Sequence, residues 1–186
     1  MFATINLGQG EFVQNKFLSL VLVLVFGALS AQAATDIHRA AKVKINQFIK
    51  QGAIIGGQTG AGFSLLGVRR HYAGGSKVER VIFDLGDKKG EPLKSQMSFY
   101  HVSVEPKLKR VVVDFAQVFK TGLTEKELNL KFKNSPVVGK VFLTFDPVDQ
   151  NTTIMFMLKS AAAVEAFELG KESKDPLRLV LDLKKI

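Results

Sequence analysis

The strings KRVVVDF at residues 109–115 and LRLVLDL at residues 177–183 follow one pattern. Each contains an arginine, three apolar residues, an aspartate and a closing apolar residue, and Arg178 follows Arg110 by 68 positions. Side chains alternate between the two faces of a strand, so the arginine and the aspartate of each string share one face. The recurrence indicates a chain that is built twice from one plan.

The neighbours of these two strings repeat as well. From Phe63 onward, apolar and polar residues alternate, which is typical of half-buried strands. The pattern predicts eight short strands, at residues 64–72, 78–86, 98–105, 109–115, 140–146, 152–159, 163–169 and 177–183. The first four strands align in order with the last four, at an offset that drifts from about 75 residues to 68.

This repeat predicts an all-β fold, a β-sandwich of two pseudo-symmetric four-stranded sheets that arose by internal duplication. Each half of the chain is expected to form one sheet, because a single sheet cannot bury its own apolar face. Thr124 followed by Glu127 predicts a capping box and a turn of helix over residues 124–128. A short helix over residues 35–51 is expected ahead of the sandwich, and five glycines within residues 52–62 predict a flexible linker.

The N-terminus has the form of a secretory signal peptide. After Lys16, the apolar run FLSLVLVLVFGALS is shorter than a typical membrane span, and an A-x-A site follows it. We expect cleavage between Ala33 and Ala34 and export to the bacterial periplasm; a retained membrane anchor is the alternative. The predicted organisation is a signal peptide, a helix with its linker, and a β domain, at residues 1–33, 34–62 and 63–186.

The composition favours anionic partners. The chain has a formal net charge of +9, and a basic surface attracts acidic polymers. Export excludes nucleic acid and leaves peptidoglycan stem peptides, lipopolysaccharide and anionic lipid headgroups, although an exported protein can also be basic without an anionic ligand. The chain contains no cysteine, so neither disulfides nor a Cys-ligated zinc site is available.

Residues that could bind an acidic ligand gather at the end of the first predicted strand and in the turn that follows. They are Arg69, Arg70, His71, Tyr72, Lys77 and Arg80. Guanidinium groups bind carboxylates through two parallel hydrogen bonds, while histidine and tyrosine add donors and a ring for stacking. A solvated basic strand end is the alternative. For the arginines and aspartates of the two opening strings, we expect ion pairs with neighbouring strands.

The sequence predicts no enzyme, no metal and no cofactor. His38, His71 and His101 lie in three different elements, and none has the spacing of zinc ligands. Neither a G-x-S-x-G elbow nor a cysteine nucleophile is present. The remaining enzymatic alternative is a glycosidase-like carboxylate pair, drawn from the aspartates of the strands: Asp84, Asp114, Asp146 and Asp182.

Three strings resemble the AMIN domain: VERVIFDLG at residues 78–86, LKRVVVDFAQV at 108–118 and DPLRLVLDL at 175–183. This all-β module precedes the catalytic domain of periplasmic N-acetylmuramoyl-L-alanine amidases and the pore of type IV pilus secretins. The resemblance covers roughly residues 63–185 and implies two symmetric four-stranded sheets and peptidoglycan binding. The sequence departs from the family pattern because no amidase or secretin domain follows before Ile186.

We therefore expect an exported, non-catalytic envelope protein that binds peptidoglycan or another anionic polymer through a basic sheet surface. Such a protein would serve in cell-wall targeting or scaffolding. The alternative is an assembly module that docks onto a secretin or pilus complex by β-strand addition, without contacting glycan.

Overall fold

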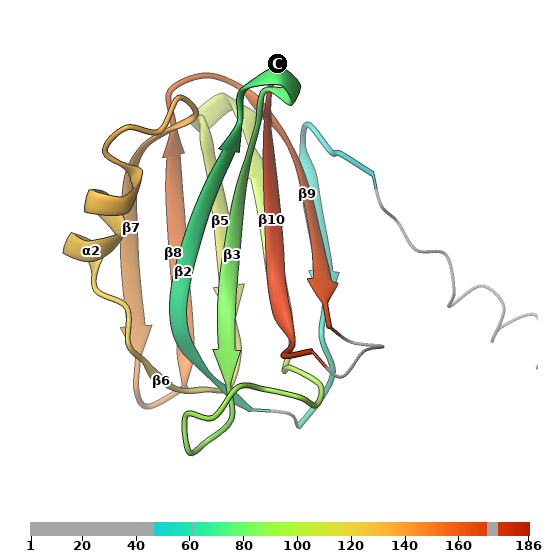
Figure 1. The fold of residues 1–186 in the computed structure, drawn as a ribbon, viewed down its shortest axis with the longest axis vertical. Helices are drawn as coiled ribbons and strands as arrows, with labels where there is room; N and C mark the ends of the chain where they lie inside the picture. Colours follow the sequence, from blue (N-terminus) through green and yellow to red (C-terminus); the bar gives the residue numbers. More distant parts are fainter. Residues whose placement is uncertain (1–46, 61, 171–174) are drawn as a thin grey trace, which may run out of the picture. The chain divides into compact units, whose positions relative to one another are not determined.

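The computed structural model of the chain describes residues 47–60, 62–170 and 175–186, which form two five-stranded sheets (Figure 1). Sheet A has the order β6 (Val118–Thr121), β2 (Phe63–Ala73), β3 (Val78–Gly86), β10 (Arg178–Lys185) and β9 (Ala162–Leu169). Sheet B has the order β1 (Gly52–Gly56), β4 (Tyr100–Glu105), β5 (Arg110–Phe115), β8 (Asn151–Leu158) and β7 (Val138–Asp146). Neighbouring strands are antiparallel, apart from β2 and β6, which are parallel.

The apolar faces of the two sheets pack against each other. The ring of Phe115 on β5 meets Phe83 of β3 edge to face, with 5.2 Å between the ring centroids, and meets Phe63 of β2 at 5.9 Å. Fully buried residues of both sheets, such as Leu181 of β10 and Phe156 of β8, belong to the same core. Burying these faces is what stabilises the two layers, and the predicted all-β class is confirmed.

All eight predicted strands are present, with ends within two residues of the predicted ones. Two strands that the sequence did not predict, β1 and β6, each extend one sheet. The sheets therefore have five strands each, and the predicted four-stranded sheets are wrong in that respect.

Each sheet draws strands from both halves of the chain, so the expectation of one sheet per half is wrong. In sheet A, β3 of the first half pairs with β10 of the second, and in sheet B, β5 pairs with β8. These inter-half ladders lie at the centre of each sheet. The reason is that the chain crosses between the sheets after each hairpin, so neither half can complete a sheet alone.

The two sheets nevertheless share one arrangement of four strands. The strands β2, β3, β10 and β9 of sheet A correspond in that order to β7, β8, β5 and β4 of sheet B. When Arg178 is aligned with Arg110, the strand pairings extend the match between β10 and β5 to three further pairs of strands: β3 with β8, β9 with β4, and β2 with β7. The register of β2 against β3 shifts between Leu65 and Gly67, and that of β7 against β8 shifts between Val138 and Lys140. These two bulges fall at corresponding positions, so the backbone repeats a feature that no sequence pattern had indicated.

The N-terminal part of the described chain closes one side of the two layers. Ile49 exchanges backbone hydrogen bonds of 2.8 and 2.7 Å with Val164 of β9, and β1 then pairs with β4 along its whole length. The predicted flexible linker is therefore wrong for residues 52–56. The predicted helix is wrong for residues 47–51, which are not helical.

The rest of the predicted helix lies outside the described residues. So does the whole predicted signal peptide, including its cleavage site between Ala33 and Ala34.

Two consecutive glycines, the last residue of β1 and the residue after it, allow the chain to pack closely against the start of β4. A Cβ on Gly56 would lie 2.3 Å from the hydroxyl oxygen of Tyr100, whose ring packs against β1. Gly57 has a φ of +84°, and a Cβ there would lie 2.1 Å from the carbonyl oxygen of Ser98. Both positions need glycine because β1 approaches the start of β4 closely.

The helix α2 (Glu125–Phe132) covers the outer edge of β7. It begins at the predicted capping box, in which Glu127 N donates to Thr124 Oγ1 over 3.2 Å and Thr124 N donates to Glu127 Oε2 over 3.3 Å. The side-chain amide of Asn129 donates to the carbonyl of Val141 and accepts from its N–H, at 2.7 and 3.0 Å. No helix among the described residues is long and apolar enough to cross a membrane.

Candidate ligand-binding surfaces

The six predicted site residues do not form one surface. Alternation along β2 and β3 places Arg69, His71 and Arg80 on the outer face of sheet A, where His71 and Arg80 are register partners. Arg70 and Tyr72 point to the opposite side of β2. Lys77 lies in the turn between the two strands, with left-handed backbone geometry.

Two of the outward arginines are already paired within the fold. Arg69 donates to both carboxylate oxygens of Asp84, at 2.8 and 2.6 Å, and Arg80 donates to both oxygens of Asp182, at 2.7 and 2.6 Å. These hydrogen bonds raise the guanidinium pKa of Arg69 and of Arg80. Because each guanidinium already holds a carboxylate, neither is available to a ligand without breaking its pair.

Arg70 takes part in a buried network that ties the α2–β7 connection to sheet A. Its guanidinium is ion-paired with Glu79, which is fully buried, and lies over the ring of Phe132 at 5.9 Å. Ser135 Oγ donates to the second carboxylate oxygen of Glu79 over 2.5 Å and accepts from the N–H of Val138 over 2.6 Å. Arg70 therefore has a structural role.

Three of the four charged residues in the two repeated strings form ion pairs with neighbouring strands, as expected. Arg110 Nε donates to Glu105 Oε2 over 3.0 Å, and Arg178 Nε lies 3.5 Å from Asp84 Oδ1. Asp182 is held by Arg80. Asp114 is held differently, by a hydroxyl and an imidazole, and this difference distinguishes the two sheets.

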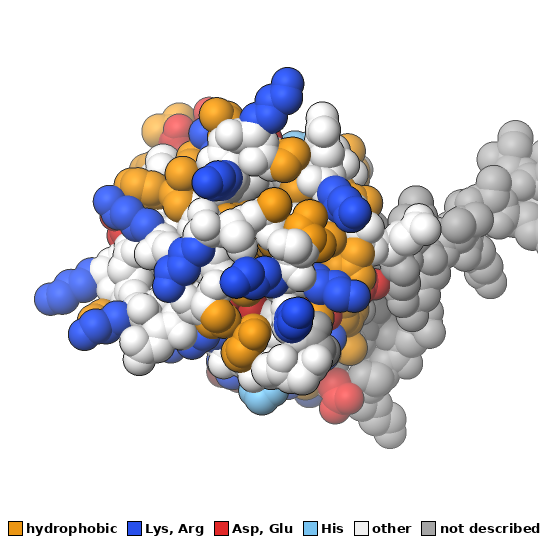
Figure 2. All heavy atoms as spheres, turned by 90° about the horizontal axis from the view of Figure 1, so that it is seen from above, with side chains coloured by type: hydrophobic (Ala, Val, Ile, Leu, Met, Phe, Trp, Pro, Cys, Tyr) orange, Lys and Arg blue, Asp and Glu red, His pale blue; other side chains and the backbone are white. Residues whose placement is uncertain are grey.

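Basic side chains, Lys or Arg, are spread over one end of the two layers (Figure 2). The turns β2–β3, β4–β5 and β8–β9 meet there with the end of β10, as shown by the backbone hydrogen bonds Lys185 N to Lys77 O and Leu158 N to Lys109 O. The exposed lysines of this surface, which we call the basic end, are Lys50, Lys77, Lys107, Lys109, Lys133, Lys159, Lys184 and Lys185.

Two carboxylates near the basic end are already ion-paired with arginines. Glu79 is paired with Arg70, and Glu105 with Arg110. The opposite end, in contrast, mixes both signs, with exposed or partly exposed residues that include Asp87, Lys88, Lys89, Glu91, Asp146 and Asp149. The excess positive charge of the described chain is therefore concentrated at one end, where it attracts anions.

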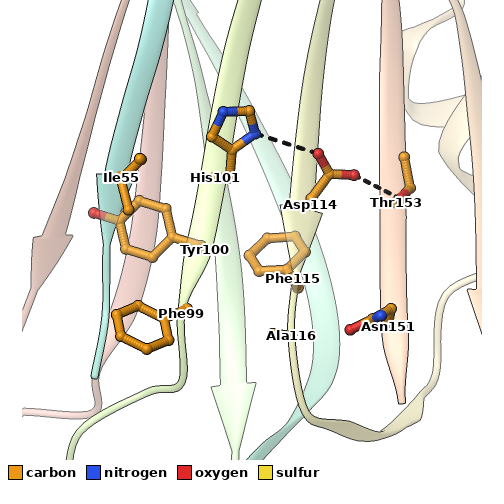
Figure 3. A pocket seen from close by; sticks show the side chains of 9 residues that line it. All are labelled: Ile55, Phe99, Tyr100, His101, Asp114, Phe115, Ala116, Asn151 and Thr153. Atoms are coloured by element: carbon orange, nitrogen blue, oxygen red, sulfur yellow. Dashed lines mark hydrogen bonds and ion pairs between the residues drawn. The ribbon is translucent and has the colours of Figure 1, made fainter. Parts of the chain in front are cut away.

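A pocket of about 320 Å³ opens on the outer face of sheet B (Figure 3). It is lined by Ile55, Phe99, Tyr100, His101, Asp114, Phe115, Ala116, Asn151 and Thr153. Three of these side chains form a row across β4, β5 and β8, because Asp114 is the register partner of both His101 and Thr153. Thr153 Oγ1 donates to Asp114 Oδ1 over 2.6 Å, and His101 Nδ1 lies 3.4 Å from Asp114 Oδ2.

Neither surface was identified from the sequence. The lysines of the basic end are scattered between residues 50 and 185, and only the strand register brings their turns together. Phe99 and Asn151 stand in no motif, and Asp114 was expected to form an ion pair or, in the enzymatic alternative, to belong to a carboxylate pair. No group of three or more His, Asp or Glu side chains that could hold a metal occurs within the described ranges.

Comparison with known proteins does not assign the chain to a family. No family profile matches the sequence, and no curated protein matches it. The resemblance to the AMIN domain therefore rests on the quoted strings and the order of the strands, and no family match supports it.

Proposed function

We propose that this protein is an exported, non-catalytic component of the bacterial cell envelope that binds peptidoglycan through its basic end. The observation that carries the proposal is the convergence of exposed lysines from separate turns on one end of the two layers. Peptidoglycan stem peptides offer free carboxylates at regular intervals, which suits such a surface.

Lysine side chains fit a polymer of this kind. An ammonium group on a flexible stem pairs with a mobile carboxylate without a fixed geometry, whereas arginine favours one planar partner. Each exposed contact contributes only about 0.2–1 kcal/mol, so one pair would bind weakly. Several lysines that engage several repeats of one polymer raise the overall affinity through effective concentration.

The proposal includes an AMIN-like domain that arose by duplication. It is supported by the three strings quoted above, by the common strand plan of sheets A and B, and by the bulges at Leu66 and Gly139, which correspond. Such a module would target or scaffold a process at the cell wall, and its place of action would be the periplasm.

We place the binding surface on the basic end instead of the outer face of sheet A that the sequence suggested. On that face, Arg69 and Arg80 already bind Asp84 and Asp182 through two hydrogen bonds each. Lys50, Lys107 and Lys185 at the basic end are exposed instead. The free positive charge therefore favours the end over the sheet face.

Docking by β-strand addition has less support. The edge of β7 is covered by α2 through Asn129, and β1 pairs along the edge of β4. On β9, Ile49 exchanges two backbone hydrogen bonds with Val164. Strand addition needs an edge with unpaired backbone groups, and these contacts occupy most of the edge of β4 and part of the edges of β7 and β9.

Sedimentation with purified peptidoglycan sacculi tests the proposal. The protein is purified from cells that express the full chain, so that any natural processing has taken place. We expect it to sediment with sacculi at low salt and to remain in solution at high salt, because exposed charge pairs are screened. With sacculi whose carboxylates have been amidated, the protein should remain in solution even at low salt. Failure to sediment with untreated sacculi at low salt would contradict the proposal.

A further inference from the structure

Both sheets have an aspartate at the same position, but the two aspartates differ in their hydrogen-bond partners and in their exposure to solvent. Asp114 on β5 corresponds to Asp182 on β10, and their partners Thr153 and Arg80 correspond as well. In sheet A, Arg80 fills both oxygens of Asp182, and the Asp182 side chain is 6% exposed. In sheet B, a threonine replaces the arginine, and the Asp114 side chain is 45% exposed. The position is closed in one sheet and open in the other.

The open carboxylate retains capacity to accept hydrogen bonds. An ionised carboxylate has about four acceptor sites. Thr153 uses one site on Oδ1, and His101 lies at the long distance of 3.4 Å from Oδ2. Asn151 adds an amide to the same pocket. The polar part of the pocket therefore offers both acceptors and donors to a ligand.

The rest of the pocket is apolar and unusually exposed. Phe99 is 46% exposed and Ile55 is 71% exposed, although both are large apolar side chains. Figure 3 shows them to one side of the row formed by His101, Asp114 and Thr153. A phenyl ring next to hydrogen-bonding groups complements a ligand that has a C–H face and hydroxyl groups at its rim.

The charge of the lining excludes an anion. The lining contains the carboxylate of Asp114 and no lysine or arginine. A volume of about 320 Å³ lies at the small end of the range for small-molecule sites, roughly 300–1,000 Å³. A single uncharged ring with several hydroxyl groups fits these conditions.

We propose that this pocket binds one ring of a neutral glycan, with Asp114 accepting hydrogen bonds from ring hydroxyls and Phe99 packing against the C–H face of the ring. This inference rests on the proposed function, since peptidoglycan contains both acidic peptides and sugar rings. Asp114 lies four positions after Arg110 on β5, and Arg110 is near the basic end, so the distance between them is roughly 13 Å at 3.3 Å per residue. One polymer can therefore reach both surfaces.

A neutral oligosaccharide tests the pocket separately from the basic end. The probe is the β-1,4-linked tetramer of N-acetylglucosamine, which has no carboxylate, titrated into isotope-labelled protein and followed by NMR. We expect saturable shifts at the amides of Phe99, His101 and Asn151. Phe99→Ala and Asp114→Asn should each weaken binding about tenfold, which corresponds to about 1.4 kcal/mol.

Phe142→Ala is the matched control, because Phe142 is a partly exposed phenylalanine of β7 on the same outer face but outside the pocket lining. It should change the affinity less than twofold. Wild-type protein that shows no saturable binding would overturn the proposal. Equal losses in Phe99→Ala and Phe142→Ala would overturn it as well. Thermal unfolding of each variant checks that the fold is retained, and the two pocket variants test the site independently.

Sedimentation with sacculi separates the two proposals. If the tetramer does not bind while wild-type protein and Phe99→Ala sediment equally with sacculi, the pocket proposal fails and the proposed function stands. If the tetramer binds at the pocket but sacculi do not retain the protein at low salt, the proposed function fails and the sugar site stands.

Discussion

Two arginine–carboxylate pairs on sheet A have the same hydrogen-bond geometry but differ in the burial of the carboxylate. The Asp182 side chain is 6% exposed, whereas that of Asp84 is 31% exposed. A buried carboxylate that loses its partner remains desolvated and unpaired, while a partly exposed one is hydrated again by water. The contribution of each arginine to stability therefore depends on its partner.

Arg80→Ala should lower the free energy of unfolding by about 1–3 kcal/mol, because Asp182 is left without its partner. Arg69→Ala, the matched control, should cost less than about 1 kcal/mol, as expected for an exposed pair. Urea denaturation of both variants measures the difference. Equal destabilisation of the two variants would contradict this interpretation.

Gly57→Ala should destabilise the fold by about 1–3 kcal/mol, since a side chain at this left-handed position also meets the backbone of Ser98. Gly67→Ala is the control, because nothing lies within 4 Å of the added Cβ and its φ is not left-handed. It should change the stability by less than about 0.5 kcal/mol. The denaturant midpoints of the two variants measure this difference in stability. Similar midpoints would show that the stability of the fold does not depend on the close packing after β1.

Alkaline pH should destabilise the fold through Tyr100. Burial raises the pKa of Tyr100, and the negative charge of Glu168 raises it further. The unfolded chain releases this proton near pH 10, whereas the folded chain holds it. The stabilising contribution is therefore complete below about pH 10 and is lost as the pH rises towards the folded pKa. Unfolding measured between pH 9 and 12 should depend less on pH in Tyr100→Phe than in the wild type.

At the scale of elements, α2 protects an edge that would otherwise pair with other chains. Asn129 satisfies both backbone groups of Val141, and Glu125 Oε2 accepts from the N–H of Leu143 over 3.3 Å. An uncovered edge strand is a template for aggregation. The helix thus makes β7 a closed edge.

Asn129→Ala should reduce the free energy of unfolding by about 1–3 kcal/mol and increase self-association, because the backbone of Val141 loses both partners. Leu130→Ala on the same helix removes a side chain that is 63% exposed and serves as control. Denaturation and size-exclusion chromatography over a range of concentrations test both effects. An Asn129→Ala protein that matches Leu130→Ala in both assays would rule out edge protection by this residue.

The elements that the sequence predicted correctly are those with a local signal. Alternation marks the eight strands, and the capping box of Thr124 and Glu127 marks the start of α2. β1 and β6 were missed because GAIIG and VFKT have no period of their own and become strands only by pairing with β4 and β2. The exchange of strands between halves was missed for the same reason, since chain crossings leave no local pattern.

At the scale of the whole molecule, the two outer faces differ although the backbone plan is shared. Arg69 and Arg80 on sheet A correspond to Phe142 and Thr153 on sheet B. One outer face is therefore filled with internal ion pairs, and the other offers an open pocket. Charge that could attract a polymer is concentrated at the basic end, which belongs to neither face.

The proposed role of the basic end is tested most directly by charge reversal at the two ends of the molecule. One variant changes the exposed residues Lys50, Lys107 and Lys185 to glutamate, and its control changes three exposed lysines at the opposite end, Lys88, Lys89 and Lys94. Both variants alter the net charge equally. We predict that at low salt the first variant no longer sediments with peptidoglycan sacculi, whereas the control sediments as the wild type does. Equal sedimentation of the two variants would contradict binding through the basic end.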